Sequence, residues 1–149
     1  MSEQLPSGLH LLQRMIRGEI PHPPVAKLIG FELLEAEDGR ALFRLEASER
    51  HSNPMGTIHG GVLCDLADAA MGCAFATTIA AGQTYTTLEL AINFLKPFWT
   101  GTLTATGRVI KRTRKVGLTE AEIVDAKGSL VAKAKSTCLI LEGEDAKGR

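Results

Sequence analysis

Apolar and polar side chains alternate along much of this chain, and the alternation predicts a sheet of about six strands. In residues 40–47, RALFRLEA, every second side chain is apolar, which indicates a strand with one buried face. An apolar run from Ile29 precedes it, and the intervening Glu37-Asp38-Gly39 is a hairpin turn signal. Strand-like segments follow at residues 84–94, 101–112, 118–126 and 130–141, with a tight turn predicted at Lys127-Gly128. Gly107 interrupts the second of these four segments and is interpreted as a bulge.

Residues 60–82, GGVLCDLADAAMGCAFATTIAAG, have a different pattern and predict one long helix. Apolar groups fall all round its helical wheel, which is typical of a helix enclosed by the rest of the fold. Asp65 and Asp68 are its only charged residues. Because an enclosed carboxylate is costly unless it is paired, hydrogen-bonded or beside a wet cleft, we expect these two side chains to have a chemical role.

The remaining segments complete the organisation of the chain. Residues 8–18 predict a short helix, which Ser7 caps and Gly18 ends. The prolines at positions 21, 23 and 24 exclude regular structure after it, and a polar loop at residues 49–58 leads to the long helix. The tail, GEDAKGR, is expected to be disordered. We therefore divide the chain into an N-terminal helix with a proline-rich lead-in (1–25), one domain (26–142) and a tail (143–149).

The order of these elements defines a fold class. A short helix, two strands, one long helix and four strands predict an α+β fold with an antiparallel sheet, because a single helix cannot cover both faces of a sheet. The sheet must curl round the long helix to enclose it. The remaining sheet face and strand edge need a partner, which predicts a homo-oligomer.

Composition and charge narrow the partners. The chain has 149 residues and a formal net charge of zero, so we expect neither nucleic acid nor a membrane as a partner. Two aspartates inside residues 60–82 argue against a membrane span, and MSEQLPSG has no secretory signal. Cys64, Cys73 and Cys138 lack zinc or disulfide spacing and are interpreted as buried apolar groups in a reducing cytosol, without a nucleophilic role. The protein is expected to be soluble and cytoplasmic.

Candidate chemistry gathers where the polar loop meets the long helix. The backbone N–H groups of Gly60 and Gly61 are unpaired at the positive end of the helix, so they can polarise a carbonyl oxygen, or the glycines can simply permit close packing. Asp68, two turns later, can act as a general base, attack the carbonyl itself, or be a hydrogen-bonded core residue. Asn53 can donate to the same oxygen or form a turn with its own backbone.

These residues resemble a known family. The segment HSNPMGTIHGG (residues 51–61), with Asp68 on the helix that follows, resembles the hotdog-fold acyl-CoA thioesterases of the phenylacetate-pathway, PaaI-like type. Asn93-Phe94-Leu95-Lys96-Pro97 resembles the end of their characteristic strand, and the likeness covers residues 29–141. The resemblance implies a hotdog fold and hydrolysis of an acyl-CoA to a free acid and coenzyme A, without cofactor or metal.

The resemblance also implies roles for particular residues. Asp68 is the expected catalytic carboxylate, and Asn53 with the Gly60 and Gly61 amides is expected to polarise the carbonyl. A hydroxyl residue on the strand that crosses the helix often helps to hold the water, and the matched strand places it at Thr87. The active sites are expected at the subunit interface of a homodimer or a dimer-of-dimers tetramer, with Asn53 and the glycines in one subunit and Asp68 and Thr87 in its neighbour.

Four further residues are expected near the substrate. His59 is expected to fix the helix entry, because its spacing from His51 lacks a strong metal-ligand pattern. Asp65 is expected near the subunit interface or bonded to a backbone amide. Arg114 and Lys115, in the densest basic run, can meet the phosphates of coenzyme A or form an ordinary solvated turn.

Several alternatives stay open. The acyl group can be aryl, with phenylacetyl as the first test, or of medium chain length, and the first helix can cap its pocket or pack on the surface. Asp68 can activate water or form a transient anhydride. The alternative functions are a hotdog hydroxyacyl dehydratase, which would pair a histidine with a carboxylate, and a non-catalytic acyl-CoA-binding module.

Overall fold

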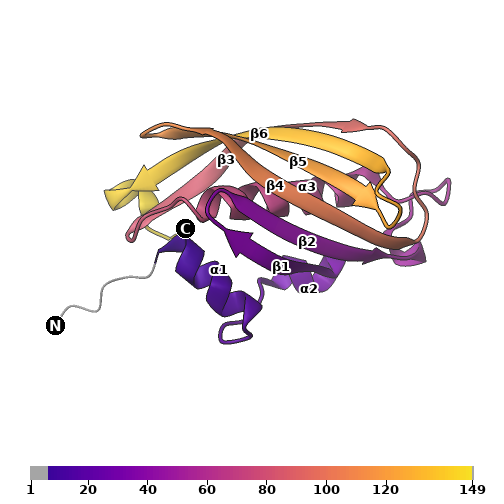
Figure 1. Ribbon diagram of the computed structural model, residues 1–149, viewed down its shortest axis with the longest axis horizontal. Helices are drawn as coiled ribbons and strands as arrows, with labels where there is room; N and C mark the ends of the chain where they lie inside the picture. Colours follow the sequence, from indigo (N-terminus) through magenta and orange to yellow (C-terminus); the bar gives the residue numbers. More distant parts are fainter. Residues whose placement is uncertain (1–6, 149) are drawn as a thin grey trace.

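In the computed structural model, which describes residues 7–148, a six-stranded antiparallel sheet folds round a central helix, α3 (Gly60–Ala76) (Figure 1). Two shorter helices pack against the first strand, and the first of them also contacts α3. The predicted α+β class, with a sheet curled round one long helix, is confirmed. The shorter helices are α1 (Gly8–Ile16) and α2 (Pro24–Ile29), and the strands lie in the order β1 (Phe31–Glu37), β2 (Arg40–Ala47), β4 (Gly101–Arg112), β5 (Val116–Asp125), β6 (Leu130–Glu142) and β3 (Gln83–Phe94).

Small residues let the sheet approach α3 closely. Ala67, Ala70 and Ala74 of the helix are fully buried. At Gly107 of β4, a Cβ atom would lie 2.1 Å from the carbonyl oxygen of Ala70. Gly107 therefore serves close packing, and the predicted bulge at this residue is wrong. The register of β4 with β5 shifts at Ile110 instead.

The central helix is shorter than the sequence predicts. It ends at Ala76 rather than near residue 82. The hydroxyl groups of Thr77 and Thr78 donate to the carbonyl oxygens of Ala74 (2.6 Å) and Phe75 (2.7 Å), so they bond the last turn back onto itself. Such side-chain bonds to the backbone compete with the helix ladder and end it here.

One stripe of α3 is left uncovered by the sheet. Gly61, Asp65 and Asp68 are exposed along it. The prediction that the whole helix is enclosed is therefore wrong for a single chain. Its alanines and glycines make every side of the wheel look apolar, whether or not a neighbouring element covers that side. Neither carboxylate pays the full cost of burying a charge.

Two expectations about irregular segments are also corrected. Pro24 does not exclude a helix, because it is the first residue of α2, where the missing N–H has no helical partner to lose. Gly30, with φ of 97°, then ends that helix in a left-handed conformation. The tail predicted to be disordered contains a short 3₁₀ helix, η2 (Gly143–Ala146). The predicted lack of a secretory signal concerns mainly residues 1–6, which lie outside the described part of the chain.

Strand β3 forms one edge of the sheet. It pairs with β6 along one side, and its other side has no partner strand within residues 7–148. None of its residues is buried. A long edge strand of this kind needs a cover, which agrees with the partner predicted for the free edge of the sheet. No helix among the described residues is long and apolar enough to cross a membrane.

Candidate active site

The first turn of α3 carries one free backbone donor. His59 caps the helix, and its Nδ1 atom accepts the N–H of Gly61 at 2.9 Å. The N–H of Val62 donates to the carbonyl oxygen of His59 at 3.0 Å. The Gly60 N–H has no intramolecular partner in the described structure. The expected pair of glycine donors is therefore reduced to one, because the cap of the helix occupies the second.

Gly60 lies close against the Phe94 side chain, which would have to shift to admit a side chain at position 60. A Cβ atom there would lie 2.9 Å from the ring of Phe94, at the end of β3. The Phe94 ring is itself half exposed, so it forms a wall over the helix start without closing it off. The backbone of Gly60 can consequently be approached by a ligand along this wall.

Asn53 is held in the loop before α3 by its own side chain. Its Oδ1 accepts the Met55 N–H at 2.9 Å, and its Nδ2 donates to the Thr57 hydroxyl at 2.8 Å. This is the turn-forming arrangement, and it still leaves the second Nδ2 hydrogen for a ligand. Asn53 and Gly60 share a cavity of about 400 Å³, which we call the Gly60 cavity. Its other lining residues are Thr57, Ile58, Leu63, Phe94, Leu95, Lys96, Pro97 and Phe98.

Asp68 and Thr87 lie together in a second part of the site, separate from the Gly60 cavity. The Thr87 hydroxyl, on β3, donates to Oδ1 of Asp68 at 3.2 Å. Asp65, one turn before Asp68 on α3, also faces solvent. The pKa of its carboxyl is raised, mainly by partial burial and to a smaller extent by the negative charge of Asp68. The expected bond from Asp65 to a backbone amide is absent among residues 7–148.

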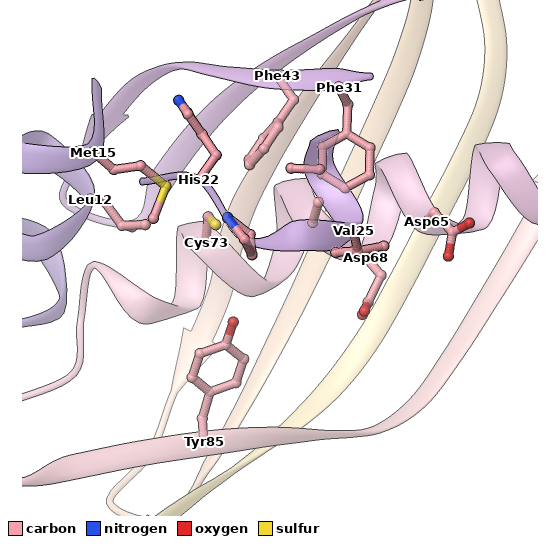
Figure 2. Close-up of a pocket in the computed structure, with 13 residues that line it drawn as sticks. Leu12, Met15, His22, Val25, Phe31, Phe43, Asp65, Asp68, Cys73 and Tyr85 are labelled. Carbon is pink, nitrogen blue, oxygen red and sulfur yellow. The ribbon is translucent and has the colours of Figure 1, made fainter. Parts of the chain in front are cut away.

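Both carboxylates stand at an apolar cavity of about 280 Å³, which we call the Asp68 cavity (Figure 2). Leu12 and Met15 of α1 line it, so the first helix caps this cavity and does not merely pack on the surface. The remaining wall consists of His22, Pro23, Val25, Ala26, Phe31, Phe43, Ala69, Cys73 and Tyr85. An apolar cavity with a few polar groups is the usual form of a small-molecule site.

Several of these wall residues were missed by sequence reasoning. Phe31 and Phe43 come from neighbouring strands and pack edge to face, with ring centroids 5.7 Å apart. Tyr85 had a readable signal, because it lies two residues before Thr87 and so shares its side of β3. Figure 2 shows its hydroxyl pointing from the strand toward α3. His22 had no such signal, since it lies in an irregular connection.

The two halves do not meet within one chain. Asp68 lies eight residues after Gly60, which is about 12 Å along the helix axis. The two residues line different cavities. A single carbonyl group cannot accept a bond from Gly60 and be attacked beside Asp68 of the same chain.

The basic turn lies far from Gly60. Arg114 and Lys115 are exposed between β4 and β5. The adjacent Arg112 donates to the hydroxyl (3.2 Å) and carbonyl (3.3 Å) oxygens of Thr78, just beyond the end of α3. The turn is thus at the opposite end of the helix from Gly60, and the structure does not bring it to the Gly60 cavity of its own chain.

The three cysteines of this chain differ in their burial. Cys64 and Cys73 are partly buried rather than fully buried as expected, whereas Cys138 is buried. Burial raises the pKa of the Cys73 thiol to about 12, so this side chain of the Asp68 cavity is a neutral thiol at neutral pH. Over residues 7–148, no three His, Cys, Asp or Glu side chains are arranged to hold a metal ion.

The six-stranded antiparallel sheet curled round one long helix is the architecture of the hotdog fold. The sequence profile of the thioesterase superfamily matches residues 55–132, and the chain belongs to that family. It is 32% identical over 108 residues to acyl-coenzyme A thioesterase PaaI of Escherichia coli, covering 72% of this chain and 75% of that one. It is 30% identical over 112 residues to 1,4-dihydroxy-2-naphthoyl-CoA hydrolase of Listeria monocytogenes, covering 75% and 91%.

A solved structure agrees with these relatives. The crystal structure of a phenylacetic acid degradation-related protein from Ralstonia eutropha JMP134 superposes with a TM-score of 0.79 and 32% identity. The match covers 86% of this chain and 98% of the other. The resemblance to PaaI-like hotdog thioesterases is confirmed, and the chain is a thioester hydrolase.

Proposed function

We propose that this protein hydrolyses an acyl-CoA to a free acid and coenzyme A, with Asp68 activating the water. The observation that carries the proposal is the contact between Thr87 and Asp68 at the mouth of the apolar Asp68 cavity. Two of the relatives are named for the hydrolysis of coenzyme A thioesters, which supports this substrate class. The acyl group lies in the Asp68 cavity, where its apolar surface leaves water.

The thioester carbonyl is polarised from the Gly60 cavity. Its oxygen accepts the N–H of Gly60 and the second Nδ2 hydrogen of Asn53. Gly60 lies at the positive end of α3, and such donors stabilise the negative charge that grows on the oxygen during attack. His59 supports this step indirectly, because it caps the helix and so fixes the direction of the Gly60 amide.

Asp68 and Thr87 manage the attacking water. Thr87 donates to Oδ1, which holds the carboxylate and leaves Oδ2 to accept a hydrogen from water. The water oxygen attacks the carbonyl carbon while its proton passes to Asp68. The carbon–sulfur bond then breaks, and the sulfur of coenzyme A leaves with that proton. Asp65 lies on the same uncovered stripe, at the entrance of the cavity.

The site is assembled from two copies of the chain. Gly60 and Asp68 of one chain lie about 12 Å apart along the helix, which supports a site whose two halves come from neighbouring subunits. The edge of β3 that has no partner strand within residues 7–148 and the uncovered stripe of α3 supply the surface for this pairing, in a homodimer or a dimer of dimers. Arg114 and Lys115 reach the phosphates of coenzyme A from the neighbouring subunit of this assembly.

Release of free thiol from a panel of acyl-CoAs tests the proposal. Asp68→Asn should lower kcat by about a hundredfold or more, since general-base catalysis contributes that much, and should still bind the substrate. Asp38→Asn, an exposed carboxylate in the β1–β2 turn, is the matched control and should behave as wild type.

Two outcomes would contradict the proposal. Equal thiol release by wild type and Asp68→Asn would exclude the carboxylate as the base. Tight binding of acyl-CoA with no release by wild type would favour a non-catalytic binding module.

A further inference from the structure

A second cavity lies directly behind the Asp68 cavity. It has a volume of about 320 Å³, and we call it the α1 cavity. It is lined by Gly8, Leu11, Leu12, Met15, Ile20, Ala76, Ile79, Gln83, Thr84 and Tyr85. Leu12, Met15 and Tyr85 line both cavities, so these three side chains form the partition between them.

Two members of the partition are held in place. The Tyr85 ring packs edge to face on Phe75, with centroids 5.6 Å apart, and burial raises the pKa of its hydroxyl. A Cβ atom on Gly72 would lie 2.7 Å from that hydroxyl, so the ring fits closely against α3. Leu12 is buried in the core, with 8% of its surface exposed.

The helix that carries Met15 cannot easily shift either. The Gly8 N–H donates to the carbonyl oxygen of Ile79 at 3.1 Å. A Cβ atom on Gly8 would lie 1.9 Å from the carbonyl oxygen of Ala76, so the start of α1 presses directly on the end of α3. Met15 itself is only partly buried, and its unbranched side chain adapts to irregular space. The movable part of the partition is therefore the Met15 side chain.

We propose that Met15 sets the length of the acyl group that this enzyme accepts, by ending the Asp68 cavity and closing off the α1 cavity behind it. The inference rests on the proposed function, because it assigns the acyl group to the Asp68 cavity. The substrate class is then an acyl-CoA whose apolar tail stops at Met15. A shorter residue at this position joins the two cavities and admits a longer tail.

Acyl-chain profiles of Met15 variants test the inference. The ratio of kcat/KM for tetradecanoyl-CoA to that for hexanoyl-CoA should rise roughly tenfold or more in Met15→Ala, because each newly buried methylene is worth roughly fourfold. Met15→Phe, which thickens the partition, should shift the profile toward shorter chains. The inference predicts opposite shifts for the two variants, so either one alone can test it. Thermal melting shows whether each variant is folded.

Leu11 provides a matched control. It lines the α1 cavity but not the Asp68 cavity, and 38% of its surface is exposed. Leu11→Trp, which fills the α1 cavity, should leave the wild-type profile unchanged. In the Met15→Ala background, the same substitution should cancel the gain for long chains.

The possible failures are distinguishable. If hydrolysis depends on Asp68 but the folded Met15 variants keep the wild-type profile, the inference on Met15 is wrong and the proposed function stands. Binding of the same acyl-CoAs to Asp68→Asn, measured by calorimetry, checks the length preference without turnover. If no acyl-CoA is bound or hydrolysed by any variant, the proposed function and the inference are both wrong.

Discussion

One imidazole decides which backbone donors are free at the start of α3. Because Nδ1 of His59 accepts the Gly61 N–H, the proton of the neutral ring is on Nε2. The cap leaves Gly60 as the donor that faces the cavity, and Asn53 adds its remaining amide hydrogen. The polarising half of the proposed site therefore depends on one backbone amide and one side chain, both fixed by bonds within their own loop.

Substitutions at Thr87 can separate a hydrogen-bonding role from a packing role. Thr87→Val keeps the shape of the side chain but removes the hydrogen bond to Asp68. A hydrogen bond to a charged group contributes about 1.5 kcal/mol at the lower end, so kcat should fall roughly tenfold while KM changes little. Thr87→Ser, which keeps the hydroxyl, should restore most of the rate. An equal loss of rate in both variants would instead indicate a packing role for Thr87.

At the scale of the elements, the fit of α3 into the sheet depends on glycine. In Gly107→Ala, the new methyl group would lie 2.1 Å from the Ala70 carbonyl oxygen, which belongs to rigid helix backbone. Overpacking of this kind costs about 3 kcal/mol of unfolding free energy. Thr106→Ala, at the half-buried neighbouring position, should cost less than about 1 kcal/mol. Urea unfolding measures both, and equal stability of the two variants would show that α3 can move away from β4.

The sequence predicts which main elements form better than it predicts where they end. The β1–β2 turn and the start of α3 at Gly60 follow from local signals that operate within a few residues. The end of α3 was misplaced because Thr77 and Thr78 end it through side-chain bonds that composition does not reveal. The sequence does not predict α2, because a proline usually breaks a helix, although at the first helical position, where Pro24 lies, it favours one.

Some features of the candidate site can likewise be predicted from the sequence, and others cannot. The resemblance placed Thr87 beside Asp68, and the structure has the two in contact. The competition of His59 for the Gly61 amide depends on a rotamer, which neither motif nor periodicity determines. The exposure of Asp68 depends on which side of α3 the sheet leaves uncovered, and that is a property of the whole fold.

At the scale of the molecule, three separate features of the chain can all be explained by one pairing of subunits. The edge of β3 has no partner strand in residues 7–148, the stripe of α3 with Asp65 and Asp68 is exposed, and the two half-sites are too far apart to act together. One pairing of subunits along this surface would answer all three. It would satisfy the edge strand, cover the helix and bring a Gly60 to an Asp68.

Mixing two inactive variants tests the two-chain site directly. Gly60→Ala places a methyl group 2.9 Å from the Phe94 ring and blocks the polarising half, whereas Asp68→Asn disables the other half. Each variant alone should be nearly inactive. In a mixed dimer, one site carries both defects and the other carries none, so random pairing should restore about one quarter of the wild-type activity.

The control for this experiment keeps the mixing but removes the complementary half. Asp68→Asn mixed with the double variant Gly60→Ala/Asp68→Asn leaves no intact site and should recover nothing. If both half-sites acted within one chain, the first mixture would stay as inactive as its components, even with mixed dimers present. Recovery in the first mixture alone can arise only when the Gly60 amide and the Asp68 carboxylate act from different chains, because no single chain in that mixture carries both.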